Sequence, residues 1–383
     1  MTDSDHRIPT ELQRSSREPD VLRRQLATWL AARLPSGASP RITDLSATSA
    51  TGLSSDTILL TAEWDDGAGR QPHDLVARIA PDMADVPVFP SYDLDLQFRV
   101  IGDVGRLSSV PVPALFWAED DPSHVGAPFF VMGRVDGVVP PDLMPYTFGD
   151  NWLYDASPED QARLAASTVE VLAGLHGIDR ATETFSYLSF GGAPAGADDS
   201  PLRNHVAHTR AWYDWVALES GPSSVIERAF SWIEEHWPDT ESPAVVSWGD
   251  SRIGNILYDN FEPAAVLDWE MAGLGPCELD LAWLIYSHRV FQDIAGSMGL
   301  PGLPEFLRPD DVATEYENRT GHALRDLDFY GTYAALQWAI VFVRTARRSV
   351  HFGEREMPAE LDDVIVNRDG LEAMFAGAYW TAE

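Results

Sequence analysis

The chain contains 383 residues, 45% of them hydrophobic and 10% aromatic, which is enough to form two domains or one large bilobal unit. All 27 basic residues are arginine and none is lysine, which excludes a Walker-type phosphate loop and Schiff-base chemistry on a lysine. The 60 acidic residues give a formal net charge of −33, which argues against nucleic-acid and anionic-membrane partners. A cationic ligand and plain solubility are both compatible with this charge.

The cysteine content and the hydropathy pattern bear on the cellular compartment. Cys277 is the one cysteine of the sequence, so no internal disulfide can form and a reducing compartment is expected. Residues 1–17 are polar and lack the apolar core of a signal peptide. The longest apolar stretch, at 333–343, is too short to span a bilayer. We therefore expect a cytoplasmic protein.

The N-terminal third has the pattern of a small sheet with one internal helix. Apolar residues recur at helical spacing in 20–34, and a Pro- and Gly-containing segment at 35–40 ends that pattern. Short runs of β-forming residues follow, separated by turns rich in Gly, Ser and Asp. We expect strands at 42–45, 57–64, 74–79, 111–118 and 128–135, and a helix at 94–107.

Beyond a hinge near 133–137 the pattern becomes mainly helical. We expect helices at 158–176, 202–218, 224–236 and 330–349, and one short β-rich island at 244–269. This outline predicts an N-terminal helical extension at 1–40, a β-rich lobe at 41–135 and a larger helical lobe at 136–383.

The strongest chemical signal is the run W-G-D-S-R-I-G-N-I-L-Y-D at 248–259, followed by A-V-L-D-W-E at 265–270. It places Asp250 five residues before Asn255, and Asp268 at the end of an apolar strand. Phosphoryl transfer needs a carboxylate beside the attacking hydroxyl and hard oxygen ligands for Mg²⁺. The D-x-x-x-x-N spacing is that of the protein-kinase catalytic loop, and Asp268 takes the place of the metal-binding Asp of D-F-G.

Together with E-L-D-L-A-W-L at 278–284, these motifs resemble the aminoglycoside phosphotransferase (choline-kinase-like) family. The usual family pattern is H-G-D-x-x-x-x-N, then I-D-W-E/F, then D-L-A. The resemblance runs from about residue 41 through nearly the whole chain, and includes P-F-F-V-M-G-R-V-D-G at 128–137 and L-H-G-I-D at 175–179. The sequence is most similar to the actinobacterial branch, whose acceptors are poorly defined.

The resemblance implies an α+β, bilobal, protein-kinase-like fold, with a small antiparallel β N-lobe containing one internal helix and a larger, mostly helical C-lobe. It also implies Mg²⁺ as cofactor and ATP or GTP as phosphoryl donor. A small hydroxyl acceptor would bind in the cleft between the lobes.

Individual roles follow from the positions that match the family pattern. Asp250 would be the catalytic base, Asn255 and Asp268 would bind Mg²⁺, and Asp280 would hold the backbone of the catalytic loop. Glu270 would lie near the acceptor. The nucleotide would contact the hinge and the turn before the second strand, at Met132, Arg134, Val135, Gly52, Ser54 and Ser55.

The chain departs from the family pattern at three places. Trp248 stands where the family usually has a histidine that supports the loop, so we expect altered packing and retained activity. Arg78 stands where a lysine normally binds the α- and β-phosphates; an arginine keeps the charge with a different geometry. The helix acid that normally pairs with that lysine is Gln97 here. Asp93, one turn earlier, faces the same side and could substitute, whereas Asp95 would point elsewhere, so the sequence does not secure this ion pair.

Each of the weaker signals also has an ordinary structural explanation. Arg78 could form a surface salt bridge and Gly52 a plain hairpin turn. His205 and His208 are three apart on a helix, but a zinc site lacks a third ligand nearby. His176 is expected to cap or pack a helix end. Four tryptophans belong either to the core or to a substrate groove: Trp212, Trp215, Trp232 and Trp237.

Acidic runs offer one further alternative. Asp310 with Asp311, and the run at 360–363, are expected to be solvated, although they could bind a polyamine. The favoured function is a small-molecule phosphotransferase acting on an aminoglycoside, another amino-alcohol or a hydroxylated metabolite. The alternative is a nucleotide- or ligand-binding pseudokinase, suggested by Arg78, Gln97 and Trp248.

Overall fold

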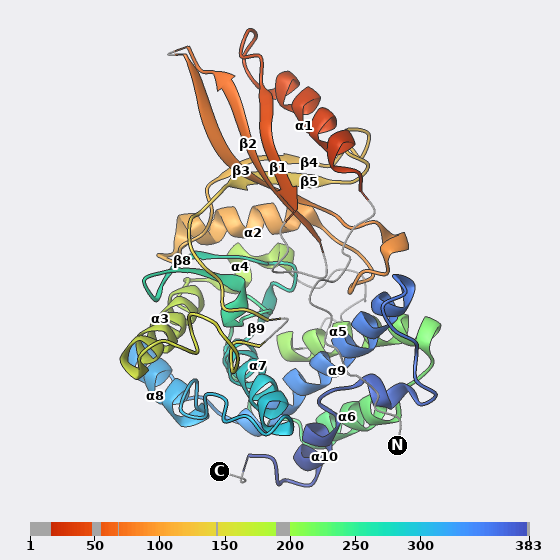
Figure 1. The fold of residues 1–383 in the computed structure, drawn as a ribbon. Helices are drawn as coiled ribbons and strands as arrows, with labels where there is room; N and C mark the ends of the chain where they lie inside the picture. Colours follow the sequence, from red (N-terminus) through yellow and green to blue (C-terminus); the bar gives the residue numbers. More distant parts are fainter. Residues whose placement is uncertain (1–16, 48–54, 68, 143–144, 189–199, 381–383) are drawn as a thin grey trace.

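The computed structural model describes residues 17–47, 55–67, 69–142, 145–188 and 200–380. These residues form a small β-rich N-lobe above a larger, mainly helical C-lobe (Figure 1). The N-lobe sheet is antiparallel, with strand order β1-β2-β3-β5-β4. Its strands are β1 (Arg41–Ala47), β2 (Asp56–Asp65), β3 (Arg70–Ile79), β4 (Leu115–Glu119) and β5 (Phe129–Gly133). This is the predicted α+β kinase-like fold class.

Helix α2 (Leu94–Leu107) lies between the sheet and the C-lobe (Figure 1). The residue before it, Asp93, accepts a hydrogen bond from the backbone N–H of Leu96 and so caps the helix. Helix α1 (Pro19–Arg33) packs its buried apolar side chains next to β1. The Trp29 Nε1–H donates to Glu119 on β4 at 2.9 Å, which fastens α1 to the sheet.

The C-lobe contains most of the remaining helices, one short hairpin and a second antiparallel strand pair. The longer helices are α3 (Pro158–His176), α5 (Pro201–Ser220), α6 (Ser224–Glu235), α7 (Glu278–Ser297), α8 (Pro309–Thr320), α9 (Leu327–His351) and α10 (Arg368–Phe375). The short helical turns are η1 (Met83–Asp85), α4 (Ala181–Thr184), η2 (Ser186–Leu188), η3 (Ile253–Asn255) and η4 (Leu361–Val364). Strands β6 (Ala244–Ser247) and β9 (Gly273–Pro276) pair, as do β7 (Ile256–Asp259) and β8 (Glu262–Val266).

Most expected elements occur close to their expected positions. The helices predicted at 94–107 and 158–176 agree to the residue with α2 and α3. The strand predicted at 111–118 begins later, at Leu115, because the prolines at 111 and 113 have no N–H for a ladder. Helix α7 is not among the helices expected from the apolar pattern. It is buried around most of its circumference, so it lacks the one-sided apolar pattern that marks an amphipathic helix.

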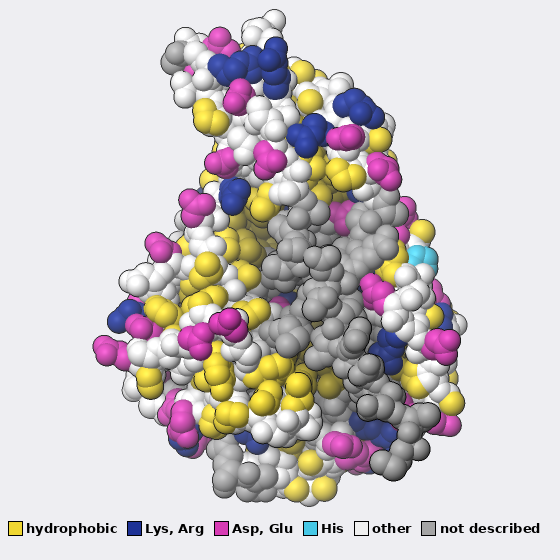
Figure 2. All heavy atoms as spheres, in the orientation of Figure 1, with side chains coloured by type: hydrophobic (Ala, Val, Ile, Leu, Met, Phe, Trp, Pro, Cys, Tyr) yellow, Lys and Arg dark blue, Asp and Glu magenta, His cyan; other side chains and the backbone are white. Residues whose placement is uncertain are grey.

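No helix within the described ranges combines the length and the apolar character that crossing a membrane requires. On the face shown in Figure 2, Asp and Glu side chains are scattered over both lobes rather than gathered in one patch.

Candidate active site

The catalytic-loop segment is held by one buried carboxylate. Asp280, on α7, accepts hydrogen bonds from the backbone N–H groups of Trp248 and Gly249 at 2.8 and 2.9 Å, and from the Ser247 hydroxyl at 2.9 Å. His176, at the end of α3, lies 3.0 Å from the same carboxylate. Burial alone would raise the pKa of Asp280, but His176 and the two amides outweigh it and lower the pKa. The loop is therefore anchored to two helices.

The turn itself requires a glycine. Gly249 has φ +88°, and a Cβ atom there would lie 2.3 Å from the carbonyl oxygen of Met271. Trp248, which replaces the usual histidine, is fully buried, and its Nε1–H contacts the carbonyl oxygens of Leu267 and Asp268 at 2.9 and 3.0 Å. The indole thus joins the catalytic loop to the turn that contains Asp268.

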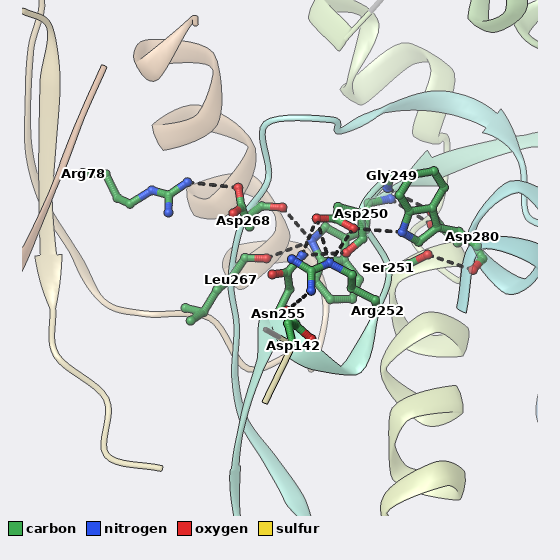
Figure 3. A network of polar contacts seen from close by, with 12 residues as sticks. Arg78, Asp142, Gly249, Asp250, Ser251, Arg252, Asn255, Leu267, Asp268 and Asp280 are labelled. Atoms are coloured by element: carbon green, nitrogen blue, oxygen red, sulfur yellow. Dashed lines mark hydrogen bonds and ion pairs between the residues drawn. The ribbon is translucent and has the colours of Figure 1, made fainter. Parts of the chain in front are cut away.

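The carboxylate of Asp250 is oriented by three side chains (Figure 3). Trp283 Nε1–H donates to Oδ1 at 2.8 Å, and Asn255 Nδ2–H donates to Oδ2 at 2.7 Å. The Arg252 Nε–H faces both oxygens, at 3.0 and 3.2 Å. These contacts hold the carboxylate in one orientation.

Three residues around Asp250 are not among the predicted site residues: Trp283, Arg252 and Asp142. Arg252 ion-pairs with Asp250 and also with Asp142, from the segment that follows the hinge. Burial opposes the charge of Arg252, but the two carboxylates outweigh it and raise the pKa above its ordinary value. Arg252 lies inside the D-x-x-x-x-N motif, two residues after Asp250, and this position is the only signal in the sequence that Arg252 belongs to the site. Nothing in the sequence connects Asp142 or Trp283 to the loop.

Asn255 and Asp268 present the oxygen donors that Mg²⁺ prefers. The Asn255 amide nitrogen donates to both the backbone and the side chain of Asp250, so its amide oxygen is the atom suited to a metal. The backbone N–H of Leu267 donates to Asn255 O at 2.8 Å, which places Asp268 next to Asn255. Asp268 has φ +59°, in the left-handed region that few residues other than glycine adopt. This donor set fits a magnesium ion.

Arg78 pairs with Asp268 rather than with an acid on α2. The Arg78 guanidinium donates to Asp268 Oδ1 at 2.9 Å (Figure 3). It also donates to the Thr57 hydroxyl at 2.9 Å. The expected pairing of Arg78 with Asp93 does not form, because Asp93 ends up as the α2 cap, outside the helix proper. Gln97 is buried on α2 and likewise makes no bond to Arg78 among the described residues.

The hinge residues differ in what they offer a nucleotide. Met132 lies inside β5, paired with Val76, and the Arg134 N–H donates to Asp74 O at 3.0 Å. Within the described chain, Val135 is the first hinge residue whose N–H is not bonded to the N-lobe backbone. Ser55 is buried at the start of β2. Gly52 and Ser54 lie outside the described residues.

A cavity of about 360 Å³ lies beside the loop, between α2 and α5. Its wall includes Glu270 and Met271 from the turn after Asp268, and Gln97 and Asp93 from the start of α2. Trp212 also lines it, whereas Trp215, Trp232 and Trp237 pack against the core. Glu270, expected near the acceptor, therefore faces a cavity adjacent to the catalytic loop.

The histidines have structural partners. His205 Nδ1 lies 2.7 Å from the Tyr333 hydroxyl, and His176 Nδ1 lies 2.9 Å from the Tyr316 hydroxyl. In the part of the chain that the structure describes, no third His, Cys or carboxylate converges on His205 and His208.

Curated relatives share part of the chain. It is 25% identical over 247 residues to the mouse "Acyl-CoA dehydrogenase family member 10", covering 61% of this chain and 21% of that protein. It is 27% identical over 195 residues to the human "Acyl-CoA dehydrogenase family member 11", covering 50% of this chain and 23% of that protein. The chain thus matches less than a quarter of the length of either relative.

Solved structures with the same fold cover nearly the whole chain. A protein from Ralstonia eutropha aligns with a TM-score of 0.61 at 20% identity, over 94% of this chain and 98% of that one. Its name gives aminoglycoside phosphotransferase as a provisional function. Macrolide 2'-phosphotransferase MphH from Brachybacterium faecium aligns with a TM-score of 0.51 at 17% identity, over 90% and 97%. Aminoglycoside phosphotransferase APH(4)-Ia, in complex with ADP and hygromycin B, aligns with a TM-score of 0.55 at 15% identity, over 92% and 98%.

The family assignment rests on the sequence itself. Residues 49–308 match the sequence profile described as "Phosphotransferase enzyme family", and this segment is more than half of the chain. It includes the catalytic-loop segment, Asp268 and Asp280. The chain therefore belongs to the phosphotransferase enzyme family.

Proposed function

We propose that the protein transfers the γ-phosphoryl group of ATP or GTP to a hydroxyl group of a small molecule, with Asp250 as the base. The observation that carries this proposal is the arrangement of Asp250 and Asn255 on one anchored loop, with Asp268 beside them on the turn after β8. In this reading residues 41–135 bind the nucleotide, residues 136–383 bind the acceptor, and residues 1–40 extend the N-lobe.

Asp250 would orient the acceptor hydroxyl and take its proton as the new P–O bond forms. Its three hydrogen-bond donors restrict the rotation of the carboxylate before the acceptor arrives. Positioning of this kind is the main contribution that a protein makes to phosphoryl transfer. Arg252 and Asp142 would be positioning residues, because they act through Asp250.

Asn255 and Asp268 would hold Mg²⁺, which neutralises the charge that develops on the phosphates. When a nucleotide binds, Arg78 would leave Asp268 and contact the phosphates. The guanidinium can bind two phosphate oxygens at once, which compensates for the absent lysine. Asp268 would then be available to the metal ion.

The nucleotide base would contact the hinge at Val135, since the N–H groups before it are bonded within the N-lobe. Met132 and Arg134 would then shape the base pocket with their side chains. Ser55, Ser54 and Gly52 belong to the segment that would cover the phosphates, as the family pattern implies. Asp280 would keep the loop in place without touching substrate.

The acceptor would be a small alcohol in the cavity bordered by Glu270. Among proteins of the same fold, one is solved with hygromycin B, and another is named a macrolide phosphotransferase. These names favour a hydroxylated small molecule for this chain as well. A cytoplasmic location would suit the buried free thiol of Cys277. Membership of the actinobacterial branch rests on the motif alone.

The test compares Asp250→Asn with Asp259→Asn, a matched change at an exposed position on β7. We expect Asp250→Asn to lower kcat for acceptor-dependent nucleotide turnover by about 10²–10⁴, with nucleotide affinity nearly unchanged. Asp259→Asn should behave as the unmodified protein does. Turnover that survives Asp250→Asn at full rate contradicts the proposal.

The second candidate is a pseudokinase that binds a nucleotide or another ligand without turnover. The ion pair between Arg78 and Asp268 favours it, because this pair occupies the two groups that a kinase needs for phosphate and metal. Thermal unfolding with ATP, with and without Mg²⁺, separates the two functions. Stabilisation that needs Mg²⁺ favours the kinase, and Mg²⁺-independent stabilisation with no turnover favours the pseudokinase.

A further inference from the structure

The cavity beside the catalytic loop has a composition that restricts which acceptors it can bind. It borders the reaction site, because Met271 in its wall lies directly against Gly249, and Glu270 follows Asp268 by two residues. Tyr92, also in the wall, has its pKa raised by burial and by the charges of Glu270 and Asp268. A ligand in this cavity is therefore close to the proposed metal and base.

One wall of the cavity is aromatic. Phe89 lies between Tyr92 and Trp212, with ring centroids 6.0 and 4.9 Å away. The Trp212 Nε1–H donates to Val88 O at 3.0 Å, and the Phe89 N–H donates to the Tyr92 hydroxyl at 3.1 Å. Three aromatic rings thus line this wall, and the faces of such rings are apolar with a negative centre. Such faces favour an apolar body and attract a cation.

The described wall contains no arginine, although the chain has 27 basic residues. Its two histidines add no positive charge at neutral pH, because burial lowers the pKa of His205 to about 4 and also lowers that of His208. An anionic ligand would therefore lose its hydration here without gaining a counter-charge. The described part of the wall therefore disfavours an acidic acceptor.

Two carboxylates line the described wall, Asp93 and Glu270. Asp93 caps α2 by accepting the Leu96 N–H at 2.8 Å, and Glu270 lies two residues after Asp268, so Glu270 is the carboxylate that we take as the counter-charge for a cation next to the reaction site. A polyamine with several ammonium groups would bury more charges than this wall can neutralise. The volume of about 360 Å³ is at the small end of the range for ligand pockets.

We propose that this cavity is the acceptor site and that its substrate is an alcohol with a largely apolar body and a single amine, rather than a polycationic aminoglycoside. The ring faces hold the apolar body, and Glu270 pairs with the ammonium group. The hydroxyl then points toward Asp250. This proposal rests on the proposed phosphotransferase function.

The first experiment is calorimetric binding to the full chain without nucleotide. The probes are phenyl- and alkyl-substituted monoamino alcohols such as 2-amino-1-phenylethanol, their N-acetyl forms, the hydroxy acid mandelate, and hygromycin B. We expect the amines to bind about tenfold more tightly than their N-acetyl forms, and mandelate and hygromycin B to bind more weakly still. If no monoamino alcohol binds, or if mandelate or hygromycin B binds more tightly, the proposal is wrong.

The second experiment locates the amine. Glu270→Gln should weaken binding of the amines about tenfold and leave the N-acetyl forms unchanged. The matched control is Glu235→Gln, an exposed position at the end of α6, which should change neither. Leu96→Phe fills the cavity and should weaken both probe forms. Equal effects of Glu270→Gln on the amines and on their N-acetyl forms contradict the assignment of the ammonium partner.

Phosphate transfer to the same probes separates this proposal from the proposed function. If the protein phosphorylates hygromycin B or a hydroxy acid and no monoamino alcohol, it is a kinase and the substrate class is wrong. If the amines bind with the expected Glu270 dependence but no probe is phosphorylated, the binding class is right, while the acceptor role and the proposed function fail together.

Discussion

The two halves of the candidate site are held in different ways. The catalytic loop is anchored by Asp280, which receives two backbone amides and a hydroxyl and lies fully buried against α3 and α7. On the nucleotide side, Arg78 holds Asp268 through one ion pair that bridges the lobes. The first arrangement suits a rigid scaffold, and the second suits a contact that substrates exchange. In the proposed function the catalytic geometry is thus built in, whereas binding of metal and phosphate would depend on breaking one interaction.

The largest expected effect is on the anchor. Asp280→Ala removes a buried charge that four groups surround and should lower the free energy of unfolding by about 3–5 kcal/mol. The control is Asp311→Ala, an exposed position on α8. Denaturant unfolding measures both variants. A loss under 1 kcal/mol for Asp280→Ala would remove the basis for calling the loop rigid.

The same anchor has a pH signature. Because the fold lowers the pKa of Asp280, its stabilising contribution is present above the ordinary aspartate pKa of about 3.9 and is lost as the pH falls below that value. Unfolding followed from pH 5 to pH 2.5 should therefore be steeper for the unmodified protein than for Asp280→Asn. Parallel curves would show that the carboxylate charge does not support the loop.

The ion pair between Arg78 and Asp268, which substrates would replace, is tested by changing Arg78. Arg78→Met should raise the KM for the nucleotide about 10- to 100-fold, since charge-assisted bonds to phosphate are lost. Arg78→Lys should recover part of this loss, because it restores the usual family residue. Arg24→Met, at an exposed position on α1, is the control. An unchanged KM for Arg78→Met would leave the ion pair to Asp268 as the whole role of Arg78.

Two buried histidines outside the catalytic loop should also make the free energy of unfolding depend on pH. Burial lowers the pKa of His205 and His288 to about 4. The unfolded chain takes up these protons near pH 6.5, so the free energy of unfolding should fall as the pH falls from 6.5 to 4. His205→Gln should flatten this fall by about 3 kcal/mol, whereas His236→Gln, at an exposed position, should not. Identical slopes would contradict the burial argument.

The smallest expected effect concerns Asp93. Asp93→Ala removes the cap of α2 and should cost about 1 kcal/mol of stability. The KM for the nucleotide should not change, because Asp93 does not contact Arg78. Asp95→Ala, at an exposed position in the first turn of the same helix, is the control. A large change in nucleotide KM would restore Asp93 as the partner of the phosphate-binding arginine.

Local patterns account for what sequence analysis could find. The spacing of Asp250 and Asn255 is short, and the Asn255 amide nitrogen donates directly to the backbone and the side chain of Asp250. Helices α2 and α3 have capping residues that mark their start, Asp93 and Ser157. Interactions of this kind are encoded within a few residues, so the printed sequence reveals them.

The contacts that sequence analysis missed join distant parts of the chain. Asp142 and Trp283 reach the loop over separations of 110 and 33 residues. The expectation for Asp93 failed for a related reason. Its spacing from Gln97 suggested a shared helix face, but the cap conformation took it out of the helix. Spacing rules hold inside a helix and fail at its first residue.

The sequence by itself determined the family, the bilobal α+β fold class and the D-x-x-x-x-N loop, because each depends on local pattern. Only the tertiary structure decided that Arg78 rests on Asp268, that Arg252 links Asp250 to Asp142, and that an aromatic cavity borders Glu270. Long-range contacts depend on how the two lobes and their helices pack against each other. The same side chain can meet different partners with a small change in packing, and no local pattern encodes which one it meets.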